Sequence, residues 1–245
     1  MKPKELSGFF DKSIKQRGYI VAFKMFKAVP SDLLKYEEKG PICLCQAIKR
    51  TNIYGSKMLL TKETKQACWF GEFSLGFSEH EKTPLLCAIL LGEGTVRKMK
   101  DDMIRLKYGL WNAILFAPLE FYDETSVEPD GVIFVVNGNQ AMTLIWSFYL
   151  ATLKKPTFSF NGHAACEIVA ALLTDKSPWL TIPCLGARAL AACQDDEVWT
   201  GFCYPHLKLV VESMTRSNIR FPMPLEQIVL FPPAPEHFIT KIITP

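Results

Sequence analysis

The chain has 245 residues, of which 49% are hydrophobic and 22% are charged, and its formal net charge is +3. This length is enough for one large domain or two small ones, each with a substantial core. The charge balance is too mild for electrostatic capture of nucleic acid or of an anionic membrane, so neither is an expected partner.

The N-terminus, the apolar runs and the cysteines together indicate a cytoplasmic protein. Residues 1–18 contain no apolar core of the kind that a signal peptide needs. The apolar stretch 132–151 is interrupted by polar residues 137–140, so it predicts a strand, a turn and a helix rather than a membrane span. Eight cysteines without a signal peptide argue against a disulfide framework, and we expect reduced thiols that are buried, reactive or bound to metal.

The first half of the chain predicts a strand, a helix, three cysteines, a second helix and a second strand. The first strand and helix are expected at 18–26 and 30–36. Residues 95–107 place apolar side chains on one helical face, and 112–120 is a short apolar strand that ends in alanine and proline. Between the two helices lie Cys45, Cys68 and Cys87.

The second half repeats this order. A buried strand at 130–138 leads into a helix that closes near Lys154, Lys155 and Pro156, with Asn137 or Asn139 as its cap. A further helix is expected at 206–217 and a final strand at 227–236. Between the two helices lie Cys166, Cys184 and Cys203.

The shared order and one shared spacing favour an internal duplication. Cys184 follows Cys68 by 116 residues, and Cys203 follows Cys87 by the same interval. We therefore predict an α+β (mixed α/β) fold built from two pseudo-symmetric halves, 1–125 and 126–245, packed as one unit. A pseudo-twofold axis would bring equivalent residues of the two halves close to one another.

Four cysteines form two equivalent pairs under this duplication: Cys45, Cys68, Cys166 and Cys184. Four converging thiolates are the ligand set of an iron–sulfur cluster or, as the fallback, of a zinc ion. Cys166 and Cys184 are expected at helix N-termini, where unpaired N–H groups stabilise a thiolate. No C-x-x-C spacing supports the site, so the alternative is that each cysteine is a small apolar core residue.

Three further residues near these cysteines are candidates for binding a cofactor or ligand. Glu72 and Arg188 each lie four residues after the second paired cysteine of their half, so they would form an ion pair near the axis. Arg188 is also suited to hold a carboxylate or phosphate of a ligand. His163, three residues before Cys166, is either a ligand or proton donor, or an exposed residue at a helix start. The acidic residues 195–197 are expected to form a solvated turn.

Four motifs resemble DUF169, a prokaryotic family known as a domain of unknown function. They are the cysteine at Cys45, C-x-x-G-x-x-x-L-G at 68–76, P-D-x-V with N-x-x-Q-x-M at 129–142, and C-x(17)-C-x-G-x-R…D-D-E at 166–197. The resemblance covers most of the chain and implies no activity. It departs at 130–132, which read D-G-V, and at 201–205, which read G-F-C-Y-P. It adds weight to a functional set of Cys45, Cys68, Cys166, Cys184, Gly186 and Arg188.

The leading hypothesis is a thiolate-ligated metal protein, with an iron–sulfur cluster in electron transfer or redox-enzyme maturation. One alternative is a protein that binds a small anionic metabolite through Arg188 and the helix N-terminus after residue 137. Another is a thiol-dependent enzyme with Cys166 or Cys184 as nucleophile, and a scaffold with core thiols is a third. The expected partner is a redox protein or a small metabolite, and a homo-oligomer is compatible with each hypothesis.

Overall fold

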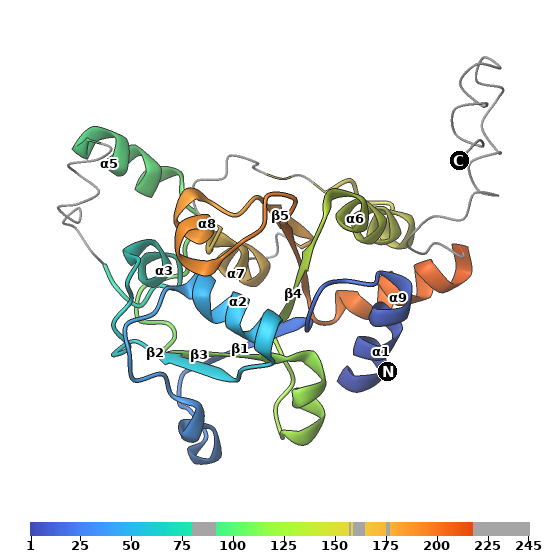
Figure 1. Cartoon of the computed structure of the whole chain (residues 1–245), viewed down its shortest axis with the longest axis horizontal. Helices are drawn as coiled ribbons and strands as arrows, with labels where there is room; N and C mark the ends of the chain where they lie inside the picture. The colour runs from blue at the N-terminus through green and yellow to red at the C-terminus, as the bar shows by residue number, and fades with distance from the viewer. Residues whose placement is uncertain (80–91, 157, 159–164, 175–176, 218–245) are drawn as a thin grey trace.

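One six-stranded antiparallel sheet runs through the protein in the order β2-β3-β1-β4-β6-β5 (Figure 1). The computed structural model describes residues 1–79, 92–156, 158, 165–174 and 177–217. Helices accompany the sheet in both halves, so the mixed α+β prediction is confirmed. The strands are β1 (Val21–Phe26), β2 (Met58–Thr61), β3 (Ala113–Pro118), β4 (Gly131–Val136), β5 (Trp179–Thr181) and β6 (Val198–Cys203).

The strand order is the same in both halves when it is followed outward from the centre. β1 and β4 pair in the middle, with Val21 opposite Ile133. β3 and then β2 continue the sheet on one side, and β6 and then β5 continue it on the other. A duplicated unit would produce this order. The duplication stays a prediction, because a shared topology does not by itself establish that the halves are copies.

Helices cover both faces of the sheet. One face carries α2 (Leu44–Tyr54), α3 (Trp69–Ser74), α7 (Glu167–Leu173) and α8 (Leu185–Ala191) (Figure 1). The other carries α1 (Pro3–Ser13), α6 (Gly138–Thr152) and α9 (His206–Ser217). The remaining described helices are α5 (Glu93–Asp102) and two 3-10 helices, η1 (Ser31–Tyr36) and η2 (Leu119–Glu124). None of the helices in these described segments combines the length and apolarity that a membrane span requires.

Alternation along the strands divides the buried side chains between two cores. In β1, Val21 and Phe23 belong to the core under α2 and α7, whereas Ala22 belongs to the core under α1 and α6. Gly201 in β6 lets α7 approach the sheet closely, since a Cβ there would lie 2.8 Å from Leu172 Cδ1 and 3.0 Å from Ile168 Cγ1. Contact with the sheet thus fixes the distance between α7 and β6, and α7 begins directly after Cys166.

The predicted helices agree with the structure where a cap or a long apolar face marks them. Asn137 caps α6, because its side chain accepts a hydrogen bond from the Gln140 amide at 3.0 Å, and α9 spans the predicted 206–217. The helix predicted at 95–107 ends early at Asp102, and 30–36 forms a 3-10 helix instead of an α-helix. The predicted strand 227–236 lies outside the described residues.

Candidate functional site

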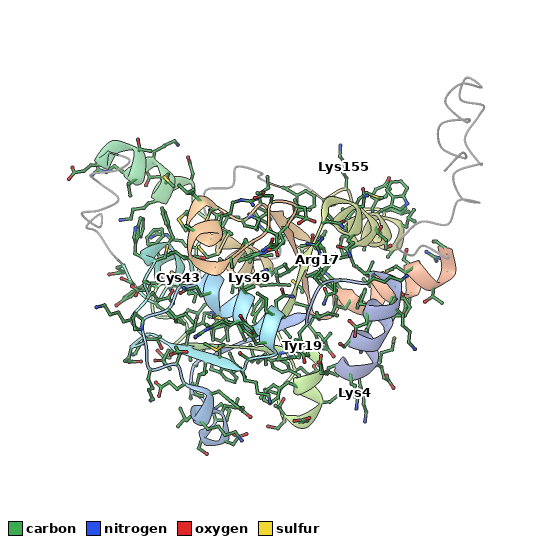
Figure 2. The ribbon with its side chains drawn as sticks, in the orientation of Figure 1. Lys4, Arg17, Tyr19, Cys43, Lys49 and Lys155 are labelled. Atoms are coloured by element: carbon green, nitrogen blue, oxygen red, sulfur yellow. The ribbon has the colours of Figure 1, made fainter. Side chains whose placement is uncertain are left out.

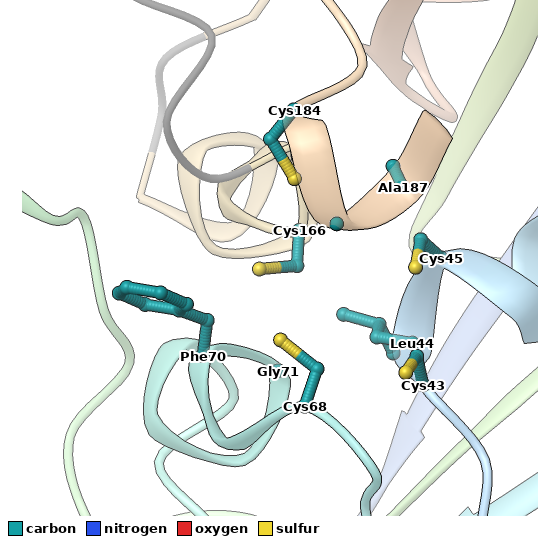
Figure 3. A pocket seen from close by; sticks show the side chains of 10 residues that line it. Cys43, Leu44, Cys45, Cys68, Phe70, Gly71, Cys166, Cys184 and Ala187 are labelled. Atoms are coloured by element: carbon teal, nitrogen blue, oxygen red, sulfur yellow. The ribbon is translucent and has the colours of Figure 1, made fainter. Parts of the chain in front are cut away.

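Five cysteines line one small cavity on the α2 and α7 face of the sheet (Figure 3). The cavity has a volume of about 20 Å³, enough for one water-sized body. The four predicted metal ligands Cys45, Cys68, Cys166 and Cys184 are among them, so tertiary structure brings together residues that lie far apart in the sequence. The fifth is Cys43, and the other lining residues are Leu44, Phe70, Gly71, Gly186 and Ala187.

Each cysteine reaches the cavity from the beginning of a helix. Cys43, Cys68, Cys166 and Cys184 immediately precede the first residues of α2, α3, α7 and α8, and Cys45 lies in the first turn of α2. Figure 3 shows Cys68 below the cavity and Cys166 and Cys184 above it, with Cys43 and Cys45 together at one side. The predicted positions of Cys166 and Cys184 at helix starts agree with this arrangement. Among the lining residues of the described chain, none carries a charged side chain.

Two hydrogen bonds join helices of the first half to helices of the second half around the cavity. The Gln46 side chain donates to the Leu190 carbonyl at 2.9 Å, which connects α2 to α8. The Ser74 hydroxyl donates to the Cys166 carbonyl at 3.2 Å, which connects α3 to α7. These contacts connect the start of α2 to the end of α8, and the end of α3 to the residue before α7.

Two glycines keep the cavity and its wall free of side chains. A Cβ on Gly71 would meet the Gln66 side chain and lie 3.0 Å from Leu44 Cβ, so this position tolerates no larger residue without a shift. A Cβ on Gly186 would have one neighbour within 4 Å, the Cys184 sulfur at 3.9 Å. A larger side chain at 186 would consequently project beside the thiol that the sequence analysis assigned to the metal.

The thiols affect one another's protonation. Burial raises the pKa of the Cys166 thiol well above its usual range, and negative charge on Cys68 and Cys184 raises it further. The hydrogen bond with Cys43 raises the pKa of Cys45, burial adds to the increase, and Cys166 and Cys184 contribute. The same hydrogen bond lowers the pKa of Cys43. Thiols in this state repel one another when ionised, so several thiolates can coexist here only with a cation between them.

The thiols surround the cavity without meeting at one point. In the part of the chain that the structure describes, no three His, Cys, Asp or Glu side chains have positions that would already hold a metal ion. Cysteine has a single side-chain torsion before the sulfur, and staggered alternatives are open to it where space allows. Ligation would therefore require thiol rotation toward the cavity centre.

The predicted charged residues lie away from this cavity lining. Arg188 donates from Nη1 to the Gln194 carbonyl at 2.9 Å and pairs with Asp195 at 3.6 Å. The predicted ion pair between Arg188 and Glu72 is wrong, because Arg188 bonds instead to residues of the loop that follows α8. The Glu72 side chain accepts a hydrogen bond from the backbone N–H of Gln66 at 3.1 Å, near the start of α3. His163 lies outside the described residues, as does Cys87.

The acidic turn differs from its prediction at one residue. Asp195 and Asp196 are exposed, as expected for a solvated turn. Glu197 is buried and accepts a hydrogen bond from Lys49 of α2 at 2.6 Å, and the two side chains are only 7% and 5% exposed. Lys49 is labelled in Figure 2. No local pattern predicts this ion pair, because its members lie 148 positions apart in the chain. Lys49 is thus a residue that positions α2, and sequence reasoning missed it.

Cys43 is the second residue that sequence reasoning did not place at the site. As strand residues, Cys43 and Cys45 would share a face, and as helix residues they would point apart. Neither case applies in the structure, because Cys43 has an extended backbone whereas Cys45 belongs to α2. The C-x-C spacing at the start of a helix was the sequence signal that could have placed Cys43 at the site. Cys193 is buried in the core on this face of the sheet, and burial is the first cause that raises its pKa to about 12.

A second, larger cavity lies on the other side of the molecule, along α6. Its volume is about 690 Å³, within the range of small-molecule sites. Met142 and Trp146 line it with 47% and 48% of their surface exposed. Gly138, the first residue of α6, also lines it, and so does Lys155 (Figure 2). Within the described lining, Lys155 is the one charged residue.

Comparison with known proteins places the chain in a family. The profile of DUF169, described as "Uncharacterised ArCR", matches residues 10–213. The chain belongs to the DUF169 family. That match includes all five cavity cysteines. An "Uncharacterized protein MJ0308" from Methanocaldococcus jannaschii is 27% identical over 179 residues, which cover 69% of this chain and 75% of that protein. No solved structure matches the chain.

Proposed function

We propose that this protein binds a thiolate-ligated metal centre, an iron–sulfur cluster, through Cys45, Cys68, Cys166 and Cys184. The observation that carries the proposal is the convergence of these four thiols, from four separate helices, on one cavity. Sulfur is the ligand type of iron–sulfur clusters, and soft thiolates also suit zinc. When bound, a cluster would supply one-electron chemistry, and the protein would set its potential through burial and hydrogen bonds to sulfur.

The surroundings of the thiols fit such a group. The cavity wall is apolar, and Cys45 and Cys166 are buried, which limits water around the sulfur atoms. Cys68 and Cys184 are half-buried, so this side of the site lies near the surface. A partner redox protein docking over α3 and α8 would therefore approach the centre closely. This geometry supports electron transfer, or maturation of a redox enzyme.

A purely structural metal is the weaker alternative. Structural zinc mainly stabilises domains too small to bury a sufficient core. This chain has two large buried clusters, one on each side of its sheet, and the cysteines belong to the edge of the first. The 20 Å³ cavity has room for a single ion as it stands, and an iron–sulfur cluster would require the helix starts to move apart. Zinc is therefore kept as the alternative occupant of the same four ligands.

A thiol enzyme has less support from the geometry. A nucleophilic cysteine needs a stabilised thiolate and access to its substrate. Cys166 is buried, and its pKa is raised rather than lowered. The cavity also has no room for an organic substrate.

The test is metal and sulfide analysis of protein purified without oxygen and reconstituted with ferrous iron and sulfide. We expect stoichiometric iron and acid-labile sulfide, with the broad visible absorption of an iron–sulfur chromophore, in the wild type. Cys45→Ser and Cys184→Ser should lose both, whereas Cys193→Ser, a buried cysteine outside the cavity lining, should keep them. Zinc without sulfide would support the alternative occupant, and absence of any metal from the anaerobic wild type would overturn the proposal.

The larger cavity favours a second candidate function, binding of a small anionic molecule. From the sequence, Arg188 and the helix N-terminus after residue 137 are predicted to bind this anion. Arg188 is engaged by its own loop, but Gly138 lines the cavity along α6, and Lys155 supplies a cation there. The apolar wall with Trp146 and Met142 suits an amphipathic or aromatic anion.

Binding of the aromatic anion anilinonaphthalene sulfonate measures this second function. We expect saturable one-site binding that Lys155→Gln weakens roughly three- to tenfold, as the loss of one partly screened charge would. Lys154→Gln, the exposed neighbour outside the lining, should bind like the wild type. Equal effects of the two substitutions, or no saturable binding by the folded protein, would contradict it.

A further inference from the structure

The cavity contains one thiol more than a four-ligand centre uses. Cys43 lines it and is 1% exposed, immediately before α2. Its backbone N–H donates to the Gln46 side chain at 2.8 Å, which holds the residue at the helix start. The role of this buried thiol is not explained by the four proposed ligands.

Cys43 and Cys45 lie on the same side of the cavity. Both side chains line it, and Figure 3 shows them together on the segment that enters α2. Cys45 is one of the four proposed ligands, so the spare thiol lies beside a ligand on the same segment of the chain.

The backbone places this pair within reach of a disulfide. Only Leu44 separates the two cysteines, and residues two apart have Cα atoms roughly 5–7 Å from each other, within the range of disulfides. Both thiols line the same cavity, so bond formation requires side-chain rotation and a small backbone adjustment. The Cys68, Cys166 and Cys184 thiols come from three other helices.

The size of the cavity selects the oxidant. A space of about 20 Å³ holds a water-sized molecule, and hydrogen peroxide is only slightly larger. A tripeptide disulfide such as oxidised glutathione is far too large to enter. Peroxide is thus the chemical class that can reach the buried pair without unfolding the site.

We propose that Cys43 and Cys45 form a peroxide-sensitive dithiol pair whose oxidation to a disulfide removes Cys45 from the metal site. The Cys43 thiolate attacks one peroxide oxygen, the O–O bond breaks, and a sulfenic acid and one water form. The Cys45 thiol then attacks the Cys43 sulfur, and the hydroxide that leaves takes up the proton of the Cys45 thiol to form the second water. Two thiols and one peroxide give one disulfide and two waters. The loss of metal rests on the proposed function, whereas the disulfide does not.

The test combines peptide mass with metal release. Trypsin is expected to release residues 40–49 as one peptide that contains Cys43 and Cys45 and no other cysteine. After peroxide treatment, denaturation and alkylation of the anaerobic protein, this peptide should be unalkylated and lighter than the dithiol form by two hydrogen atoms. Oxidised glutathione at the same concentration should leave it doubly alkylated.

The matched variants are Cys43→Ser and Cys193→Ser. Cys43→Ser should bind metal at the wild-type stoichiometry and release it roughly tenfold more slowly under peroxide, because Cys45 then has no adjacent thiol partner. Cys193→Ser should behave like the wild type. A doubly alkylated peptide after peroxide treatment, or loss of metal in untreated Cys43→Ser, would overturn the inference. Wild-type protein without metal would instead reject the proposed function, and the peptide mass would still decide whether the pair oxidises.

Discussion

The ion pair between Lys49 and Glu197 gives the sharpest prediction about stability. Its atoms are 2.6 Å apart and its side chains are 5% and 7% exposed, so neither charge has access to bulk water. Lys49→Met leaves the Glu197 carboxylate buried without its cation, in a structure where its Oε2 atom already lacks a hydrogen-bond partner. Breaking a buried pair in this way costs about 3–5 kcal/mol, a large share of the roughly 5–15 kcal/mol that stabilises a typical domain.

Urea unfolding followed by circular dichroism measures this loss. The double variant Lys49→Met/Glu197→Met removes both charges and should recover most of the loss, since two apolar residues of similar size replace the pair. Arg50→Met is the control on the same helix, because its ion pair with Glu38 is more exposed, and it should cost less than about 1 kcal/mol. If Lys49→Met costs no more than Arg50→Met, the reasoning that an isolated charge is trapped beside α2 is refuted.

Three further predictions concern other parts of the fold. Gly201→Val forces a side chain against Leu172, so α7 must move away from the sheet. We expect a loss of about 1–3 kcal/mol in the free energy of unfolding, measured in urea, and reduced metal retention. Unchanged stability would contradict this packing. Asn137→Ala removes the α6 cap and should cost about 0.5–2 kcal/mol, measured by the same unfolding, and no loss would show that the cap is dispensable. Partial desolvation and then the charge of Glu120 raise the pKa of the exposed Asp11 carboxyl, so the native state binds more protons than the unfolded state, and stability falls as pH rises from about 3.8 through the raised folded value. Asp11→Asn should therefore raise the thermal midpoint at pH 7 and not below about pH 3; an equal effect at both pH values would exclude charge as the cause.

Local signals determined the elements that the sequence predicted well. A cap residue before a long apolar run located α6, and short, nearly continuous apolar runs located β1 and β4, because these signals lie within a few residues of one another. The same local reasoning placed Cys166 and Cys184 at helix starts. The helix predicted through residue 107 ends at Asp102, although Met103 and Leu106 beyond it are buried, so apolar spacing alone did not fix the end.

The sequence by itself determined the mixed α and β composition, the strands β1, β3 and β4, and the four cysteines proposed as a ligand set, because each depends on local pattern or spacing. The strands β2, β5 and β6 were not predicted. Only the tertiary structure decided that those thiols surround one cavity, since four helices must be docked on one sheet before their starts meet. It also decided that Cys43 joins them, that Arg188 turns to its own loop, and that Glu197 is buried against Lys49. Such pairings depend on which distant segments lie opposite each other, and the chain's local chemistry does not encode that choice.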